Sequence, residues 1–122
     1  MKKGNKDGEL VRRTRAFALA VIRFVEALPA TKTADTLGRQ LLRAGTSVGA
    51  NYRAACRARS TADFLNKLGL VEEEADECDY WLGMMADAGV VEAIATKPLT
   101  EEANEITAMV VASIKSVRRK PS

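Results

Sequence analysis

The sequence predicts an all-α protein that folds as an antiparallel up-down-up-down four-helix bundle. Hydrophobic residues make up 47% of the chain but aromatic residues only 5%. Most apolar positions hold Ala, Leu or Val, which favours helix over strand. Three of the four expected segments repeat apolar residues at alternating spacings of three and four, which is the period of one helix face. Short connections between long helices favour antiparallel neighbours.

The chain length of 122 residues suits one domain with a single hydrophobic core. We expect residues 9–119 to form this four-helix-bundle domain, residues 1–8 a flexible basic N-terminus, and residues 120–122 a tail. The basic start has no apolar run typical of a secretory signal, and the apolar window at residues 16–28 is too short and too charged to span a bilayer. A cytoplasmic protein without a membrane partner is therefore expected.

The first helix is expected at residues 9–28, where Pro29 ends it. Its apolar face contains Leu10, Thr14, Phe17, Val21, Phe24 and Leu28. The second helix is expected from about residue 35 to residue 59. Its apolar face contains Leu37, Leu41, Ala44, Val48, Tyr52 and Ala55. Both faces predict burial against the rest of the bundle.

One flank of the second helix holds only small residues, namely Gly38, Gly45, Gly49 and Cys56. A glycine inside a helix costs about 1 kcal/mol relative to alanine. Three glycines on one flank therefore predict that another backbone approaches closely there, within the bundle or between subunits.

The third helix is expected at residues 61–88, with Ser60 as its N-cap because a serine hydroxyl can accept from a backbone amide. Gly89 is a suitable residue for its C-terminal end. The apolar face of this helix contains Thr61, Phe64, Leu68, Val71, Ala75, Cys78, Leu82 and Met85. Tyr80 and Trp81 are expected to pack against a neighbouring helix or subunit rather than on bases, since no basic residue interleaves with them.

Residues 90–99 are expected to form a connector with at most one helical turn, and Pro98 falls inside it. Thr100 is then the expected N-cap of the fourth helix, because its hydroxyl can satisfy a free backbone amide. The apolar line of this helix contains Ile106, Val110, Ile114 and Val117.

The residue types needed for catalysis are largely missing. The chain contains no histidine, the commonest general base and metal ligand. Glu72, Asp76 and Asp79 share a flank and could hold a hard cation, but no facing helix offers matching carboxylates at core positions. Cys56 and Cys78 fit no metal or redox spacing and are expected as buried thiols. We therefore expect no catalytic residue, no metal and no cofactor, and a protein that is not an enzyme.

Charge is distributed unevenly along the sequence. Arginines of the second helix fall within about 80° of one another, opposite its apolar face. Residues 35–59 contain five arginines and one acid, whereas residues 60–88 contain eight acids and one base. With three arginines of the first helix, the candidate nucleic-acid-binding residues are Arg39, Arg43, Arg53, Arg57, Arg12, Arg13 and Arg15.

The run RAGTSVGANYRAACRARSTADFLNKLGLVEEEADECDYWL resembles the signature of a bacterial four-helix-bundle protein family, first noticed as reading frames within intervening sequences of large-subunit ribosomal RNA. The matching residues are Arg43, Ser47, Val48, Asn51, Arg59, Ser60, Asp63, Phe64, Trp81 and Leu82, with Glu77 in looser register. Many members have Ala-Glu-Gly where this chain has Ala54, Ala55 and Cys56.

This resemblance implies an antiparallel bundle that assembles as a ring-like homopentamer. It also implies kinship with the accessory protein of diversity-generating retroelements, a basic pentamer that binds nucleic acid and a reverse transcriptase. It implies no catalytic residue.

Two functions follow as hypotheses. The first is a non-enzymatic cytosolic oligomeric adaptor that binds RNA or DNA through the arginine-rich helix face, with a further protein partner. The second is a protein-only scaffold or interaction module, in which the arginines pair with the acidic third helix of neighbouring subunits. Both are physically reasonable, because phosphates and carboxylates are equally suitable partners for arginine.

Overall fold

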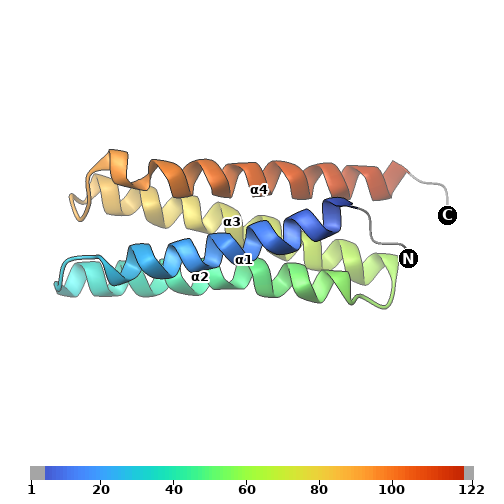
Figure 1. Cartoon of the computed structure of the whole chain (residues 1–122), viewed down its shortest axis with the longest axis horizontal. Helices are drawn as coiled ribbons and strands as arrows, with labels where there is room; N and C mark the ends of the chain where they lie inside the picture. Colours follow the sequence, from blue (N-terminus) through green and yellow to red (C-terminus); the bar gives the residue numbers. More distant parts are fainter. Residues whose placement is uncertain (1–4, 120–122) are drawn as a thin grey trace.

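The computed structural model describes residues 5–119, and these residues form four helices and no strand. The helices are α1 (Asn5–Glu26), α2 (Lys32–Cys56), α3 (Thr61–Asp87) and α4 (Ala93–Arg119). Figure 1 shows them as long, roughly parallel rods in which consecutive helices run in opposite directions, so that α1 begins and α4 ends at the same end of the molecule. The predicted all-α, four-helix architecture is confirmed.

The first two helices both begin earlier than the sequence predicts. Helix α1 begins at Asn5, inside the segment expected to be flexible, and ends at Glu26 before Pro29. Helix α2 begins at Lys32 because Thr31 acts as its N-cap, with the Thr31 hydroxyl accepting from the Ala34 amide at 3.1 Å. The expected start near residue 35 is therefore wrong, since a cap inside the polar link was not recognised.

The predicted ends of α3 are confirmed to within one residue. The Ser60 hydroxyl accepts from the Asp63 amide at 3.0 Å and caps the helix that begins at Thr61. The helix ends at Asp87, and Gly89 follows with a φ of +74°. This left-handed conformation strains any residue with a Cβ, so glycine suits the position.

Helix α4 corrects the sequence-based prediction for residues 90–100. It begins at Ala93 and includes Pro98 in its second turn, so Thr100 lies inside the helix and does not cap it. A proline there removes one backbone hydrogen bond and crowds the preceding turn. Leu99, only 7% exposed, packs into the core beside this proline. We attribute the longer helix to this burial, which local propensity does not reveal.

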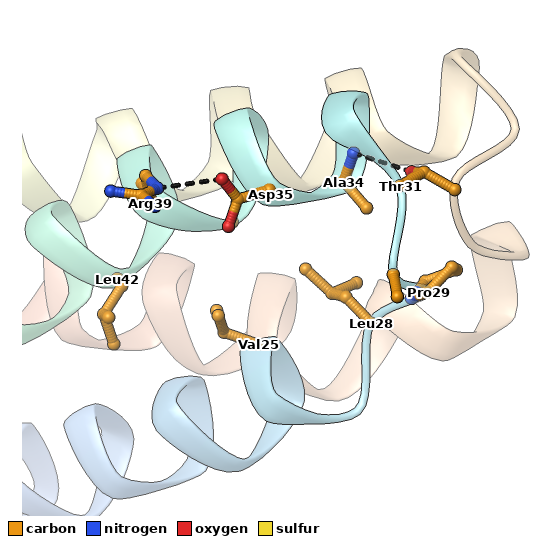
Figure 2. Close-up of a pocket in the computed structure, with 10 residues that line it drawn as sticks. Val25, Leu28, Pro29, Thr31, Ala34, Asp35, Arg39 and Leu42 are labelled. Atoms are coloured by element: carbon orange, nitrogen blue, oxygen red, sulfur yellow. Dashed lines mark hydrogen bonds and ion pairs between the residues drawn. The ribbon is translucent and has the colours of Figure 1, made fainter.

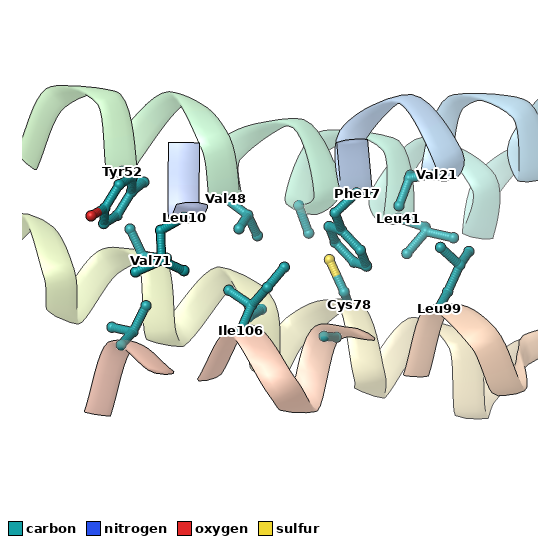
Figure 3. Close-up of a cluster of buried hydrophobic side chains, with 14 of the residues drawn as sticks. Leu10, Phe17, Val21, Leu41, Val48, Tyr52, Val71, Cys78, Leu99 and Ile106 are labelled. Carbon is teal, nitrogen blue, oxygen red and sulfur yellow. The ribbon is translucent and has the colours of Figure 1, made fainter. Parts of the chain in front are cut away.

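The core contains apolar residues from all four helices, and most of the predicted apolar faces are confirmed. Figure 3 shows Phe17 of α1, Val48 of α2, Cys78 of α3 and Ile106 of α4 pointing into the same interior. Thr61 is exposed, contrary to expectation. Four further positions are buried that the sequence did not single out, namely Ala34, Thr96, Leu99 and Ala103.

The glycine flank of α2 is the surface on which α1 packs. A Cβ added at Gly45 would lie 2.8 Å from Val21 Cγ1, and one added at Gly38 would lie 3.0 Å from Leu28 Cδ1. At Gly49 the nearest atom would be the backbone oxygen of Thr14, at 3.4 Å. The close approach predicted from these glycines is confirmed, and it occurs within the bundle.

No stretch of the described helices is both long enough and apolar enough to cross a membrane.

We predict that Gly45→Ala destabilises the fold by about 1–2 kcal/mol, because the new methyl group overlaps the fully buried, branched Val21 side chain. Gly69→Ala is the matched control. A Cβ at Gly69 would meet no atom within 4 Å, so this variant should be about 1 kcal/mol more stable than the wild type. Urea unfolding of both variants measures the difference, and equal stabilisation of the two would contradict the close packing at Gly45.

Candidate nucleic-acid interface

The arginines predicted on one face of α2 differ in what they contact. Arg39 is 78% exposed, and its Nε donates to Asp35 Oδ2 on the same helix at 3.0 Å. Arg43 reaches across to α3, where it pairs with Glu74 at 3.3 Å and with Glu77. These two arginines therefore meet carboxylates of their own chain.

The contact of Arg43 extends into α3. Glu77 also accepts a hydrogen bond from the indole nitrogen of Trp81 at 3.1 Å. The Trp81 ring is half-buried against the core and stands edge-on to Tyr80, with ring centroids 5.0 Å apart. Arg43, Glu77 and Trp81 thus form one polar link between α2 and α3.

The other two arginines of this face, Arg53 and Arg57, have no acidic partner within residues 8–119. Arg53 lies in the last turn of α2 and Arg57 is the C-cap residue, and together they form a ridge between two hollows. On one side is a groove of about 490 Å³ between α1 and α2, hereafter the α1–α2 groove. On the other side is a hollow of about 440 Å³ between α2 and α3.

The three candidate arginines of α1 lie on different sides of that helix. Arg13 faces α4, where its guanidinium donates to both carboxylate oxygens of Glu102 at 2.8 and 2.9 Å. This hydrogen bonding raises the pKa of Arg13 above its ordinary value. Arg15 instead lines the α1–α2 groove together with Arg53 and Arg57, and Arg12 is exposed outside it.

The seven candidate arginines therefore do not form one surface. Arg15, Arg53 and Arg57 are brought together at the groove, whereas Arg13, Arg39 and Arg43 are held by carboxylates. Sequence reasoning did not select Arg59 and Lys67, which lie in the α2–α3 hollow next to the same ridge. Arg59 lies at the predicted end of the second helix, three residues beyond the observed end at Cys56, and Lys67 lies in the second turn of α3, so their closeness to the same ridge was the available signal.

Charge is separated along the axis of the bundle. One half, hereafter the basic end, comprises residues 8–15, 45–73 and 107–119 and contains ten basic and four acidic side chains. The opposite half, residues 16–44 and 74–106, contains five basic and eleven acidic side chains. In Figure 1 these halves are the right and left sides of the molecule. The antiparallel topology therefore brings basic side chains that lie far apart in the sequence together at one end of the bundle.

A hollow of about 650 Å³ lies at the opposite end of the α1–α2 pair, around the loop at Pro29. Figure 2 shows Val25, Leu28 and Leu42 around it, with the Arg39–Asp35 ion pair at its edge. Because the only arginine of this hollow is already neutralised by an aspartate, the hollow is a poor site for an anion.

Residues 6–112 match the 23S rRNA-intervening sequence protein family. The match covers most of the chain. The protein belongs to this family. Its resemblance to the family, predicted from the run between Arg43 and Leu82, is thereby confirmed.

This family member is similar in structure to a protein from Bacteroides thetaiotaomicron VPI-5482. That protein, known from a crystal structure, belongs to the S23 ribosomal protein family and is of unknown function. The two chains are 31% identical, with a TM-score of 0.85, over 90% of this chain and 98% of the other. No similar sequence was found among curated proteins.

In this family member the residues that gave the resemblance have structural contacts. Arg43, Glu77 and Trp81 link α2 to α3, and Ser60 caps α3. Phe64 packs against the core. The motif therefore specifies how α2 meets α3, and the uncompensated arginines Arg53 and Arg57 lie among these positions without being part of the motif.

The two thiols of the protein differ in environment. Burial raises the pKa of the Cys78 thiol to about 12, with the nearby Glu74 carboxylate contributing in the same direction. Cys56 is half-buried and lines the α1–α2 groove. Within residues 8–119, no three Cys, Asp or Glu side chains come together as metal ligands would.

We predict that iodoacetamide at pH 8 modifies Cys56 in the native protein and leaves Cys78 unmodified, because the thiolate is the reactive species and the raised pKa of Cys78 keeps it protonated. Intact-mass measurement should find one added group before unfolding and two after it. The Cys56→Ser variant is the control and should gain no group while folded. Rapid modification of both thiols in the native protein would contradict the burial of Cys78.

Proposed function

We propose that the protein is a non-enzymatic, oligomeric adaptor that binds RNA or DNA through its basic end. The observation that supports this most directly is the cluster of Arg15, Arg53 and Arg57, none of which has an acidic partner in the described residues. Other arginines of the same two helices are neutralised by carboxylates of the chain. A phosphate backbone would supply the missing negative charge.

The groove between the arginines supports binding rather than catalysis. Two threonines line it, and both hydroxyls donate to backbone carbonyls of their own helix: Thr14 to Leu10 at 2.7 Å and Thr46 to Leu42 at 2.8 Å. No carboxylate or imidazole lines the groove to serve as a general base. The groove thus offers positive charge and shape without a nucleophile and base pair.

We predict that the protein binds nucleic acid with an affinity that falls steeply as salt rises, because each phosphate contact releases counterions. The double variant Arg53→Gln/Arg57→Gln should weaken binding at every salt concentration. For a single strand, it should also reduce the slope of log affinity against log salt by about 1.4 per subunit, which corresponds to two lost phosphate contacts. Fluorescence anisotropy titrations at several salt concentrations measure both quantities.

The matched control for this prediction is Arg23→Gln/Arg39→Gln. It removes the same charge from exposed helix positions in the opposite half of the bundle, so its affinity and salt slope should stay close to those of the wild type. Equal loss in the two double variants would indicate a general effect of net charge. Absence of binding at low salt would contradict the proposed function.

We further propose that the protein assembles as a homo-oligomer, with the ring-like pentamer expected from the resemblance as the specific form. Apolar side chains on the outward surface of α3 support an interface there: Tyr80 is 56% exposed, Met84 one turn further along is also exposed, and Leu70 adds exposed apolar surface in the first half of the helix. Ile94 at the start of α4 is 69% exposed. A closed ring would repeat the basic end around a symmetry axis, and several weak sites would then act together on one strand.

We predict that Tyr80→Glu/Met84→Glu lowers the oligomeric state in native mass spectrometry, because it places charge in an apolar interface. Leu19→Glu is the control, since Leu19 is also exposed but lies on α1, which is diagonally opposite α3 in the bundle. An unchanged oligomer in the α3 variant would exclude this surface. A different result would favour the protein-only scaffold, in which these arginines pair with the acidic α3 of a neighbouring subunit. In that case the Arg53→Gln/Arg57→Gln variant would dissociate, and the wild type would bind no nucleic acid.

A further inference from the structure

The α1–α2 groove has a floor of short side chains. Ala18 of α1 and Gly49 and Cys56 of α2 line it, and Thr14 and Tyr52 are buried beneath. The backbones are close at this level, because a Cβ on Gly49 would be in contact with the Thr14 carbonyl oxygen. The groove is therefore an open, mostly apolar depression whose depth comes from small residues between two tightly packed helices.

The edges of the groove are basic. Arg15 lies on the α1 side and Arg53 and Arg57 on the α2 side, and no acidic residue lines the groove. Along a helix, residues four apart are separated by about 6 Å. Arg53 in the last turn of α2 and Arg57 at its C-cap can therefore contact neighbouring phosphates of one strand, while Arg15 faces them from the other side.

The other hollows lack this combination. The α2–α3 hollow contains Asp63, whose carboxylate pairs with Lys67 at 3.2 Å. The hollow around Pro29 contains the Asp35–Arg39 pair. A smaller hollow between α1 and α4, about 200 Å³ and including Met109, has no charged lining residue. The α2–α3 hollow shares Arg53 and Arg57 with the groove, but only the α1–α2 groove combines arginines with a lining free of acidic residues among these hollows of the described chain.

We infer that the α1–α2 groove binds single-stranded nucleic acid, with an unstacked base on the apolar floor and its flanking phosphates on Arg53 and Arg57. This inference rests on the proposed function and specifies which form of nucleic acid is bound. A paired duplex keeps its bases stacked inside the helix, so only its phosphates could reach these arginines. A single strand can turn a base away from its neighbours and bury it.

The test compares three labelled probes of equal length: a single strand, the duplex of the same sequence, and a strand in which abasic sites replace the bases. All three carry phosphates, but only the single strand can place a base in the groove. Anisotropy titrations at one salt concentration should give an affinity for the single strand about fivefold above that for the other two, since burying roughly 40 Å² of apolar base surface strengthens binding by about this factor.

Two variants fill the groove without changing its charge, Ala18→Leu and Ala50→Leu, at positions that line it on opposite sides. Each should abolish the preference for the single strand and leave affinity for the abasic strand unchanged, which also shows that the basic end is still folded. The matched control is Ala54→Leu, because Ala54 lines the α2–α3 hollow and not the groove. This control should keep the preference.

If the protein bound all three probes with equal affinity, and Ala18→Leu and Ala50→Leu did not change it, the base site would be overturned. The proposed nucleic-acid binding would remain. Absence of binding to every probe at low salt would overturn both. Competition with a free mononucleotide tests whether the groove binds a nucleic-acid strand or a small ligand of the same chemistry. We expect no displacement at concentrations where an unlabelled strand displaces the probe fully, and displacement as effective as that by the strand would overturn the assignment to a strand.

Discussion

The close packing of α1 on α2 is the constraint on which the rest of the molecule depends. Gly45 leaves room for Val21, so the two helices lie nearer than ordinary side chains would permit. This approach fixes the rotation of α1. It places Phe17 and Val21 in the core, Arg13 towards Glu102 of α4, and Arg15 towards the arginines of α2. The groove and its basic edge follow from the same contact.

The antiparallel order of the helices converts a mixed linear sequence into a molecule with a basic and an acidic end. Within this charge distribution, Arg43 pairs with both Glu74 and Glu77 of α3, and its positive charge reduces the repulsion between these two carboxylates. At the basic end no acid of the described chain compensates Arg53 and Arg57, and their mutual repulsion slightly opposes the folded state. Any polyanion that binds there would therefore also stabilise the fold, since it relieves that repulsion and binds only the native arrangement.

The helix faces could be predicted from sequence because periodic apolar residues and the Ser60 cap are local signals. The starts of α2 and α4 could not be predicted in the same way. Thr31 lies in a polar segment that resembles a loop, and Pro98 is tolerated inside α4 because Leu99 beside it is buried. The candidate site was predicted only in part. Arg13 and Arg15 are two residues apart and therefore about 200° apart around the helix, so which of them joins Arg53 depends on how α1 is rotated.

The motif that identifies the family and the residues that form the groove have different physical roles. Arg43, Glu77 and Trp81 set the position of α3 against α2, and a relative with 31% identity and a TM-score of 0.85 indicates that this architecture persists when most side chains differ. Membership of the family therefore specifies the bundle more firmly than any ligand. What the protein binds depends on the side chains placed around the α1–α2 groove. There, charge without a partner and a floor without large side chains occur together, a combination that folding alone does not require.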